Sequence, residues 1–100
     1  MTHDTIVTEF ENRASLDCAF VVIDITALDR AGAEDFDPDA TLGISGADRF
    51  GIDVRAQEDN DYRITYDHVA DELAVQNVAD GTDVADNTAV GEVMLEVVGL

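Results

Sequence analysis

Short segments in which every second residue is apolar run through most of this 100-residue chain, and this period of two limits the folds open to it. Successive side chains of a β-strand point to opposite faces of a sheet, so such alternation predicts strands with one buried face. The clearest alternating segments are residues 5–11, 50–55, 62–66, 72–78 and 92–98. The sequence therefore predicts an all-β protein.

Residues 19–26 differ from the alternating segments because they read AFVVIDIT, with an apolar or β-branched residue at nearly every position. Such a segment is typical of a strand that is buried on both faces. It also holds the longest apolar run, residues 19–23. That run is far shorter than the ~20 residues of a membrane-spanning helix, so we expect no membrane partner.

Turn-forming residues separate the alternating segments. Residues 57–61 are polar and suit a hairpin loop, residues 67–71 join the next two segments, and Asp80-Gly81 is the clearest turn dipeptide in the chain. We therefore interpret residues 50–100 as an antiparallel meander of four strands. The regular spacing indicates a single small antiparallel β-sandwich or barrel of about six to seven strands, interrupted by an irregular acidic insertion.

The chain length allows one domain, which we divide into two parts. Residues 19–100 form the predicted β domain. Residues 1–18 form an N-terminal arm or edge strand, because the polar segment 11–17 interrupts the alternation. An arm that carries Ile6 and Phe10 suits strand addition to a neighbouring subunit.

The acidic insertion lies within residues 27–49. Pro38 and a cluster of aspartates favour an irregular excursion over a long helix. Within it, residues 41–45 suggest a short edge strand or a 3₁₀ turn.

The charge of the chain is extreme, because 23 Asp and Glu stand against five basic residues, all of them Arg, and the net charge is -18. In a domain with a radius of gyration of ~13 Å, most charges lie within about one Debye length of another in dilute buffer. Molar salt shortens that length to ~3 Å and removes most of the repulsion. We therefore expect a protein adapted to near-saturated salt, from a haloarchaeon or its virus. An acidic mesophilic protein or a cation buffer is the alternative. With a net charge of -18 we expect no binding of nucleic acid in either case.

The residue inventory offers little for catalysis. The chain has two His, two Ser and one Cys. We place His3 on a mobile terminus, His68 in a turn, and Cys18 in the core as a small apolar residue. No pattern joins a nucleophile to a base and an orienting acid, so we expect no enzyme and assign no catalytic residue.

Three aspartates, Asp35, Asp37 and Asp39, resemble the opening of a calcium loop. That loop needs Gly at its sixth position and an acidic residue at its twelfth, where this chain has Ala40 and Gly46. We therefore expect no cofactor and no specific metal site. Weak binding of Mg²⁺, Na⁺ or K⁺ at the acidic loops is the alternative. It applies equally to a second set, which is Asp80, Asp83 and Asp86.

Arginines are scarce on this acidic chain, and Arg49, Arg55 and Arg63 lie in or beside its strand-like half. A guanidinium group pairs with carboxylates in bidentate fashion, so we expect these residues to hold acidic neighbours or partner subunits. Together with Ile6 and Phe10, they are the interface candidates.

The second half of the chain also carries an ordered series of motifs. These are FGIDVR (50–55), YRITYD (62–67), ELAVQN (72–77), DGTDVA (80–85) and VGEVMLEVVG (90–99). The series resembles the small all-β virion structural proteins, head-decoration proteins among them, of tailed viruses and proviruses.

The resemblance implies a virion structural protein of a haloarchaeal tailed virus, with capsid decoration as its role. Such proteins bind the outer head shell and stabilise it, often as trimers. The implied partners are the major capsid protein or other virion proteins, together with further copies of the chain, a trimer being favoured. The implied location is the virion, assembled in the high-salt host cytoplasm.

Two alternatives stay open. One is a host-encoded halophilic β-sandwich that acts as a ligand-binding or regulatory module, which predicts an apolar pocket with converging polar groups. The other is a different part of the virion, such as a turret, tail or head–tail joining subunit.

Overall fold

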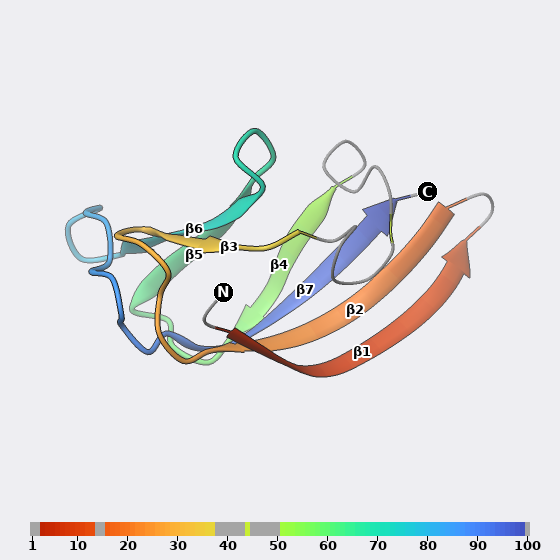
Figure 1. Cartoon of the computed structure of the whole chain (residues 1–100), viewed down its shortest axis with the longest axis horizontal. Helices are drawn as coiled ribbons and strands as arrows, with labels where there is room; N and C mark the ends of the chain where they lie inside the picture. The colour runs from red at the N-terminus through yellow and green to blue at the C-terminus, as the bar shows by residue number, and fades with distance from the viewer. Residues whose placement is uncertain (1–2, 14–15, 38–43, 45–50, 100) are drawn as a thin grey trace.

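A computed structural model of the chain describes residues 3–13, 16–37, 44 and 51–99, and for residues 6–13, 16 and 17 it describes the backbone alone (Figure 1). The seven strands are β1 (His3–Arg13), β2 (Leu16–Ile25), β3 (Ala33–Asp35), β4 (Ile52–Gln57), β5 (Tyr62–Asp67), β6 (Glu72–Asn77) and β7 (Gly91–Gly99). The described residues contain no helix, and hence none long and apolar enough to cross a membrane. The predicted all-β fold is confirmed.

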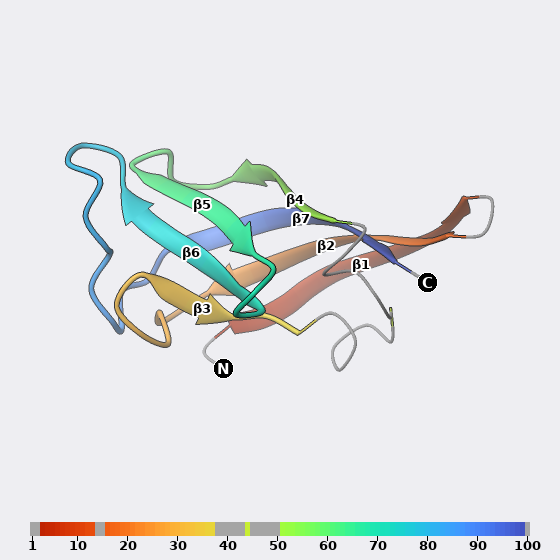
Figure 2. The same ribbon diagram turned by 90° about the horizontal axis from the view of Figure 1, so that it is seen from above.

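The strands form two antiparallel sheets, one with four strands in the order β1-β2-β7-β4 and one with three in the order β3-β6-β5. The three-stranded sheet covers one face of the four-stranded sheet, and the β1–β2 hairpin extends beyond it (Figure 2). The core lies between the two layers, as the predicted sandwich requires. Its fully buried side chains include Val21, Ile23, Leu73, Val75, Val93, Leu95 and Val97.

Strand β2 is buried on one face only, so the prediction of burial on both faces is wrong. Ala19, Val21 and Ile23 are fully buried against the other sheet, whereas Phe20 and Val22 are half-buried. The apolar run arises because β2 lies between β1 and β7, where β-branched residues pack well against neighbouring strands. Its second face is the outer surface of the sandwich.

The predicted four-strand meander is also wrong. Strand β4 pairs with β7, and β5 pairs with β6 through the turn at residues 68–71. The chain crosses between the sheets after β4 and again after β6, so that apolar residues of both sheets, such as Ile52 and Ile64, reach one core. Polar turn residues suit a hairpin and a crossing equally well, so the sequence does not separate the two.

Strand β1 forms one edge of the four-stranded sheet. Its backbone pairs with β2 from His3 opposite Ile25 to Arg13 opposite Leu16, with one register shift between Thr5 and Val7. The polar segment 11–17 does not interrupt the pairing of β1 with β2, because its described residues continue the hairpin ladder. Backbone hydrogen bonds hold a hairpin end together where apolar alternation has stopped.

The acidic segment after β2 contains the short strand β3, which pairs with β6. Residue 44 is the only part of the suggested edge strand or 3₁₀ turn at 41–45 that is described, and the Ile44 side chain is buried in the core. Cys18 is also buried, as predicted.

Candidate interaction surface

The structure separates the predicted interface residues. Arg55 and Arg63 lie exposed on β4 and β5, which are edge strands of different sheets joined by one connection. Phe10 lies opposite Ala19 in the β1–β2 ladder, and Ile6 lies at the register shift in β1. Arg49 falls outside the described residues.

Arg30, which sequence reasoning missed, forms the main cationic cluster. Its guanidinium donates to both carboxylate oxygens of Asp35, at 3.2 and 2.7 Å, and also donates to Glu72. These bonds raise the pKa of Arg30 and lower the pKa of Asp35. The cluster ties the turn before β3 to β6. The five-residue spacing across Ala31-Gly32 is the only sequence signal that could have revealed it.

Arg55 and Arg63 contrast with Arg30. Within the described part of the chain, neither guanidinium forms a hydrogen bond or an ion pair.

A β-bulge determines where Arg55 lies. The register of β4 with β7 shifts between Val54 and Ala56, so Arg55 is the extra residue of the bulge. As a result Arg55 and Ala56 are consecutive exposed residues on a strand that otherwise alternates. The bulge also disrupts the outer edge of β4, which disfavours the addition of another strand there.

Three apolar residues form a row across the outer face of the four-stranded sheet. Val22 of β2 lies opposite Met94 of β7, which in turn lies opposite Ala56 of β4. Met94 is one of the few large apolar side chains that the described residues leave exposed. We call Val22, Met94 and Ala56 the apolar row.

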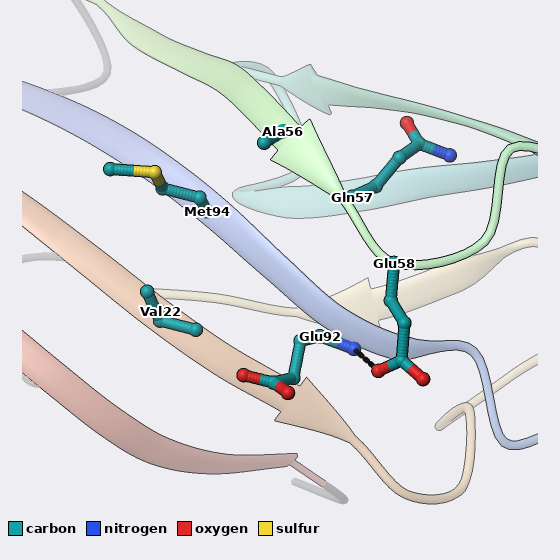
Figure 3. A pocket seen from close by; sticks show the side chains of 6 residues that line it. All are labelled: Val22, Ala56, Gln57, Glu58, Glu92 and Met94. Carbon is teal, nitrogen blue, oxygen red and sulfur yellow. Dashed lines mark hydrogen bonds between the residues drawn. The ribbon is translucent and has the colours of Figure 1, made fainter.

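The apolar row lines a depression of about 330 Å³, completed by Gln57, Glu58 and Glu92 (Figure 3). Glu58 and Glu92 stand at one end of it. The backbone N–H of Glu92 donates to Oε1 of Glu58 at 3.0 Å, and the N–H of Glu58 donates to the carbonyl of Glu92 at 2.9 Å. The depression therefore has an apolar floor and a carboxylate rim, and it lies open on the sheet face.

Carboxylates face one another on both sides of the apolar row. Asp24 lies opposite Glu92, and Asp53 lies opposite Glu96. Like charges directly opposite in a sheet are destabilising by roughly 0.2–1 kcal/mol per pair. Salt or a cationic partner group would relieve this repulsion.

A buried acid–histidine pair joins the two edge strands on the other side of the sandwich. Nδ1 of His3 lies 2.7 Å from Oε2 of Glu34, and the two side chains are 3% and 0% exposed. The N–H of Asp29 donates to Oε1 of Glu34 at 3.0 Å, and the His3 ring centroid lies 6.0 Å from that of Phe36. The expectation of a mobile His3 is therefore wrong, since a terminal residue becomes ordered when a buried partner holds it.

Several carboxylates of the described acidic loops accept hydrogen bonds from backbone N–H groups two residues further along the chain. Oδ1 of Asp80 accepts from the N–H and the hydroxyl of Thr82, at 3.1 and 2.7 Å, and these bonds lower the pKa of Asp80. The described residues hold no group of three or more His, Cys, Asp or Glu side chains that could bind a metal ion. Asp39 of the calcium-like motif lies outside them. His68 is exposed in the β5–β6 turn.

The outer face of the four-stranded sheet thus carries an apolar row with carboxylates beside it, and β4 carries an arginine that has no partner among the described residues. Searches against protein-family models, curated proteins and solved structures found no match to this chain.

Proposed function

We propose that this chain is a non-enzymatic virion structural protein of a haloarchaeal tailed virus, acting as a capsid decoration protein on the outer head shell. It would stabilise the shell through many weak contacts, because attachment to a lattice at several points multiplies weak affinities. Its partners would be the major capsid protein and further copies of itself.

The observation that carries the proposal is the open outer face of the four-stranded sheet, with an exposed apolar row beside an unpaired Arg55. Such a face suits binding to another protein surface, where apolar residues supply area and arginine supplies directed hydrogen bonds. The segments that resemble virion proteins include most of β4, then β5, β6, part of the connection at 78–90 and β7, so the resemblance spans both layers of the sandwich.

The high negative charge supports the halophilic part of the proposal. A net charge of -18 on a fold with a radius of gyration of 13.0 Å requires screening to stay compact.

A ligand-binding module is the second candidate, and the depression of about 330 Å³ favours it. Ligand pockets bury 70–90% or more of their ligand and are mostly concave. This depression lies open on a sheet face, so it fits a protein side chain better than an enclosed small molecule.

Immunogold electron microscopy of virus particles from the source culture, purified in molar salt, tests the proposal. Antibodies against the chain should label the outer head shell of intact particles. Labelling of tails or turrets would assign another virion role, and labelling confined to host cytoplasm would overturn the virion proposal.

A further inference from the structure

We propose that the outer face of the four-stranded sheet binds a basic segment of another protein, in which lysine or arginine flanks an apolar side chain on both sides. The inference depends on the structural role proposed above and names the chemistry of the partner. We call this surface the docking face. It consists of the apolar row together with five carboxylates, which are those of Asp24, Asp53, Glu58, Glu92 and Glu96.

The apolar row has no covering layer among the described residues. The three-stranded sheet packs on the opposite face of the four-stranded sheet (Figures 1 and 2). Met94 is 36% exposed at the centre of the row, Ala56 is exposed, and both line the depression of about 330 Å³ (Figure 3). A partner that covers the row would remove these side chains from water, which is favourable in proportion to the apolar area buried.

Carboxylates lie on both sides of the apolar row along β7. Side chains alternate along a strand, and Val93 and Leu95 are buried in the core, so Glu92, Met94 and Glu96 share the outer face. Four residues of a strand span about 13 Å, which separates the backbone positions of Glu92 and Glu96 and places Met94 midway between them.

The neighbouring strands widen both ends of this pattern. Asp24 of β2 lies opposite Glu92, and Asp53 of β4 lies opposite Glu96, while Glu58 stands beside Glu92 at the rim of the depression. None of the ion pairs within the described part of the chain involves any of these carboxylates. The docking face therefore holds two rows of like charges, one on each side of the apolar row.

These charges select a cationic partner. A second copy of this chain would bring the same five carboxylates against them, and Arg55 of β4 could offset one at most. Like charges that meet across an interface oppose binding, whereas a lysine or arginine over each row would pair with carboxylates that otherwise face one another. Charge and apolar position together therefore specify a segment that reads basic, apolar, basic.

An extended segment matches the spacing of the rows. In a strand, residues i, i+2 and i+4 face the same side and span about 13 Å. A segment with Lys or Arg at i and i+4 and an apolar residue at i+2 therefore presents its cations at the separation of Glu92 and Glu96 when it lies along β7. Its apolar side chain then falls over Met94.

Fluorescence anisotropy of a rhodamine-labelled peptide in molar KCl tests the inference. The peptide repeats Lys-Thr-Leu-Thr twice and ends in Lys, so that one face of the extended chain alternates cation and leucine. Molar salt screens the long-range attraction of any cation to the net charge of -18, so that binding reports close contacts. The dissociation constant should lie below about 1 mM. Peptides with Ser for Leu, or with Glu for Lys, should bind at least about tenfold more weakly.

The carboxylates of β7 are tested with a matched control. Glu92→Gln/Glu96→Gln should weaken binding of the Lys-Leu peptide at least about fivefold, because two charge pairs are lost. Asp83→Asn/Asp86→Asn removes the same charge from two exposed residues of the connection between β6 and β7, outside the four-stranded sheet. Its dissociation constant should stay within about twofold of the wild type.

The apolar row has its own matched pair of variants. Met94→Ser should weaken binding of the Lys-Leu peptide at least about threefold and leave the Lys-Ser peptide unchanged. Val69→Ser makes a similar change at an exposed valine of the β5–β6 turn and should leave binding of both peptides unchanged. Circular dichroism of each variant in molar KCl identifies any loss of fold.

Four results would overturn the inference. The first is no binding of the Lys-Leu peptide up to about 1 mM, and the second is equal binding of the Ser or Glu peptide. The third is equal weakening by Glu92→Gln/Glu96→Gln and its control. The fourth is self-association of the wild type, measured by sedimentation equilibrium, that Glu92→Gln/Glu96→Gln strengthens, which would assign the docking face to a second copy.

The particle labelling described above is independent of these measurements. Labelled heads without peptide binding would refute this partner chemistry but not the virion role. Peptide binding at the docking face without labelled particles would do the opposite.

Discussion

The buried pair of His3 and Glu34 provides the sharpest prediction about stability. Glu34 is 0% exposed, and the His3 ring supplies one of its hydrogen-bond partners. His3→Leu keeps an apolar side chain against Phe36 but leaves the carboxylate without that partner. Removing one member of a buried pair typically costs about 3–5 kcal/mol.

We expect a loss of about 3 kcal/mol in the free energy of unfolding, at the low end because the Asp29 N–H still donates to Glu34. For a domain of this size, each 1 kcal/mol lowers Tm by about 4–8 °C. The variant should therefore unfold at least about 12 °C below the wild type. Thermal and urea unfolding in molar KCl, followed by circular dichroism, measures both quantities.

Two variants make this prediction specific. His3→Leu/Glu34→Leu removes both members of the pair, and replacing a buried pair by apolar residues is often neutral, so it should recover most of the lost stability. His68→Leu changes the exposed histidine of the β5–β6 turn and should stay within about 0.5 kcal/mol of the wild type. Two results would contradict this role of the pair. One is a loss of stability in His3→Leu as small as that in His68→Leu, and the other is a double variant whose loss equals the sum of the losses of His3→Leu and Glu34→Leu.

Two further predictions concern the loops and their charges. Because Arg30 lowers the pKa of Asp35 from its ordinary 3.8, the Asp35 carboxylate stabilises the fold above about pH 4, and this stabilisation is lost as the pH falls through its lower folded value. Arg30→Gln should raise the Asp35 pKa in an NMR titration and make the free energy of unfolding fall less steeply as the pH drops below about 4. An unchanged Asp35 titration would contradict the assigned pair. Gly32 has φ +75°, and an added Cβ would lie 2.6 Å from Cγ of Asp83. Gly32→Ala should therefore cost at least about 2 kcal/mol in urea unfolding. Gly81→Ala, at φ +71° with open space around it, should cost only about 1 kcal/mol. Equal costs would show that the backbone angle alone matters.

The sequence is sufficient to predict six of the seven strands but not how they pair; β3 lies in the acidic segment that the sequence predicted to be irregular. Alternation at 62–66 and 92–98 located β5 and β7, because burial of one face imposes a period of two. The partner of β4 was mispredicted, because polar residues at 57–61 suit either a hairpin or a crossing between sheets. The partial exposure of the outer face of β2 was mispredicted for a related reason. Apolar and β-branched residues suit a central strand between two neighbours as well as a strand covered by a second layer.

The candidate site was predictable only in part. Scarce arginines on an acidic chain pointed to Arg55 and Arg63 as contact residues, and both are exposed in the fold. Nothing in the sequence marked the bulge at Arg55 or the meeting of Val22, Met94 and Ala56, because both depend on the register of β7. His3 and Glu34 are 31 residues apart and meet only through the folding of β1 and β3 into opposite layers.

We infer that this acidic sandwich depends on salt to stay folded and to bind other surfaces. The most direct test is the free energy of urea unfolding of the full chain as a function of KCl concentration, from about 0.05 M to molar. The free energy of unfolding should rise steeply over this range, with unfolding or loss of cooperativity at the low end. A cooperative fold of equal stability in dilute buffer would contradict it.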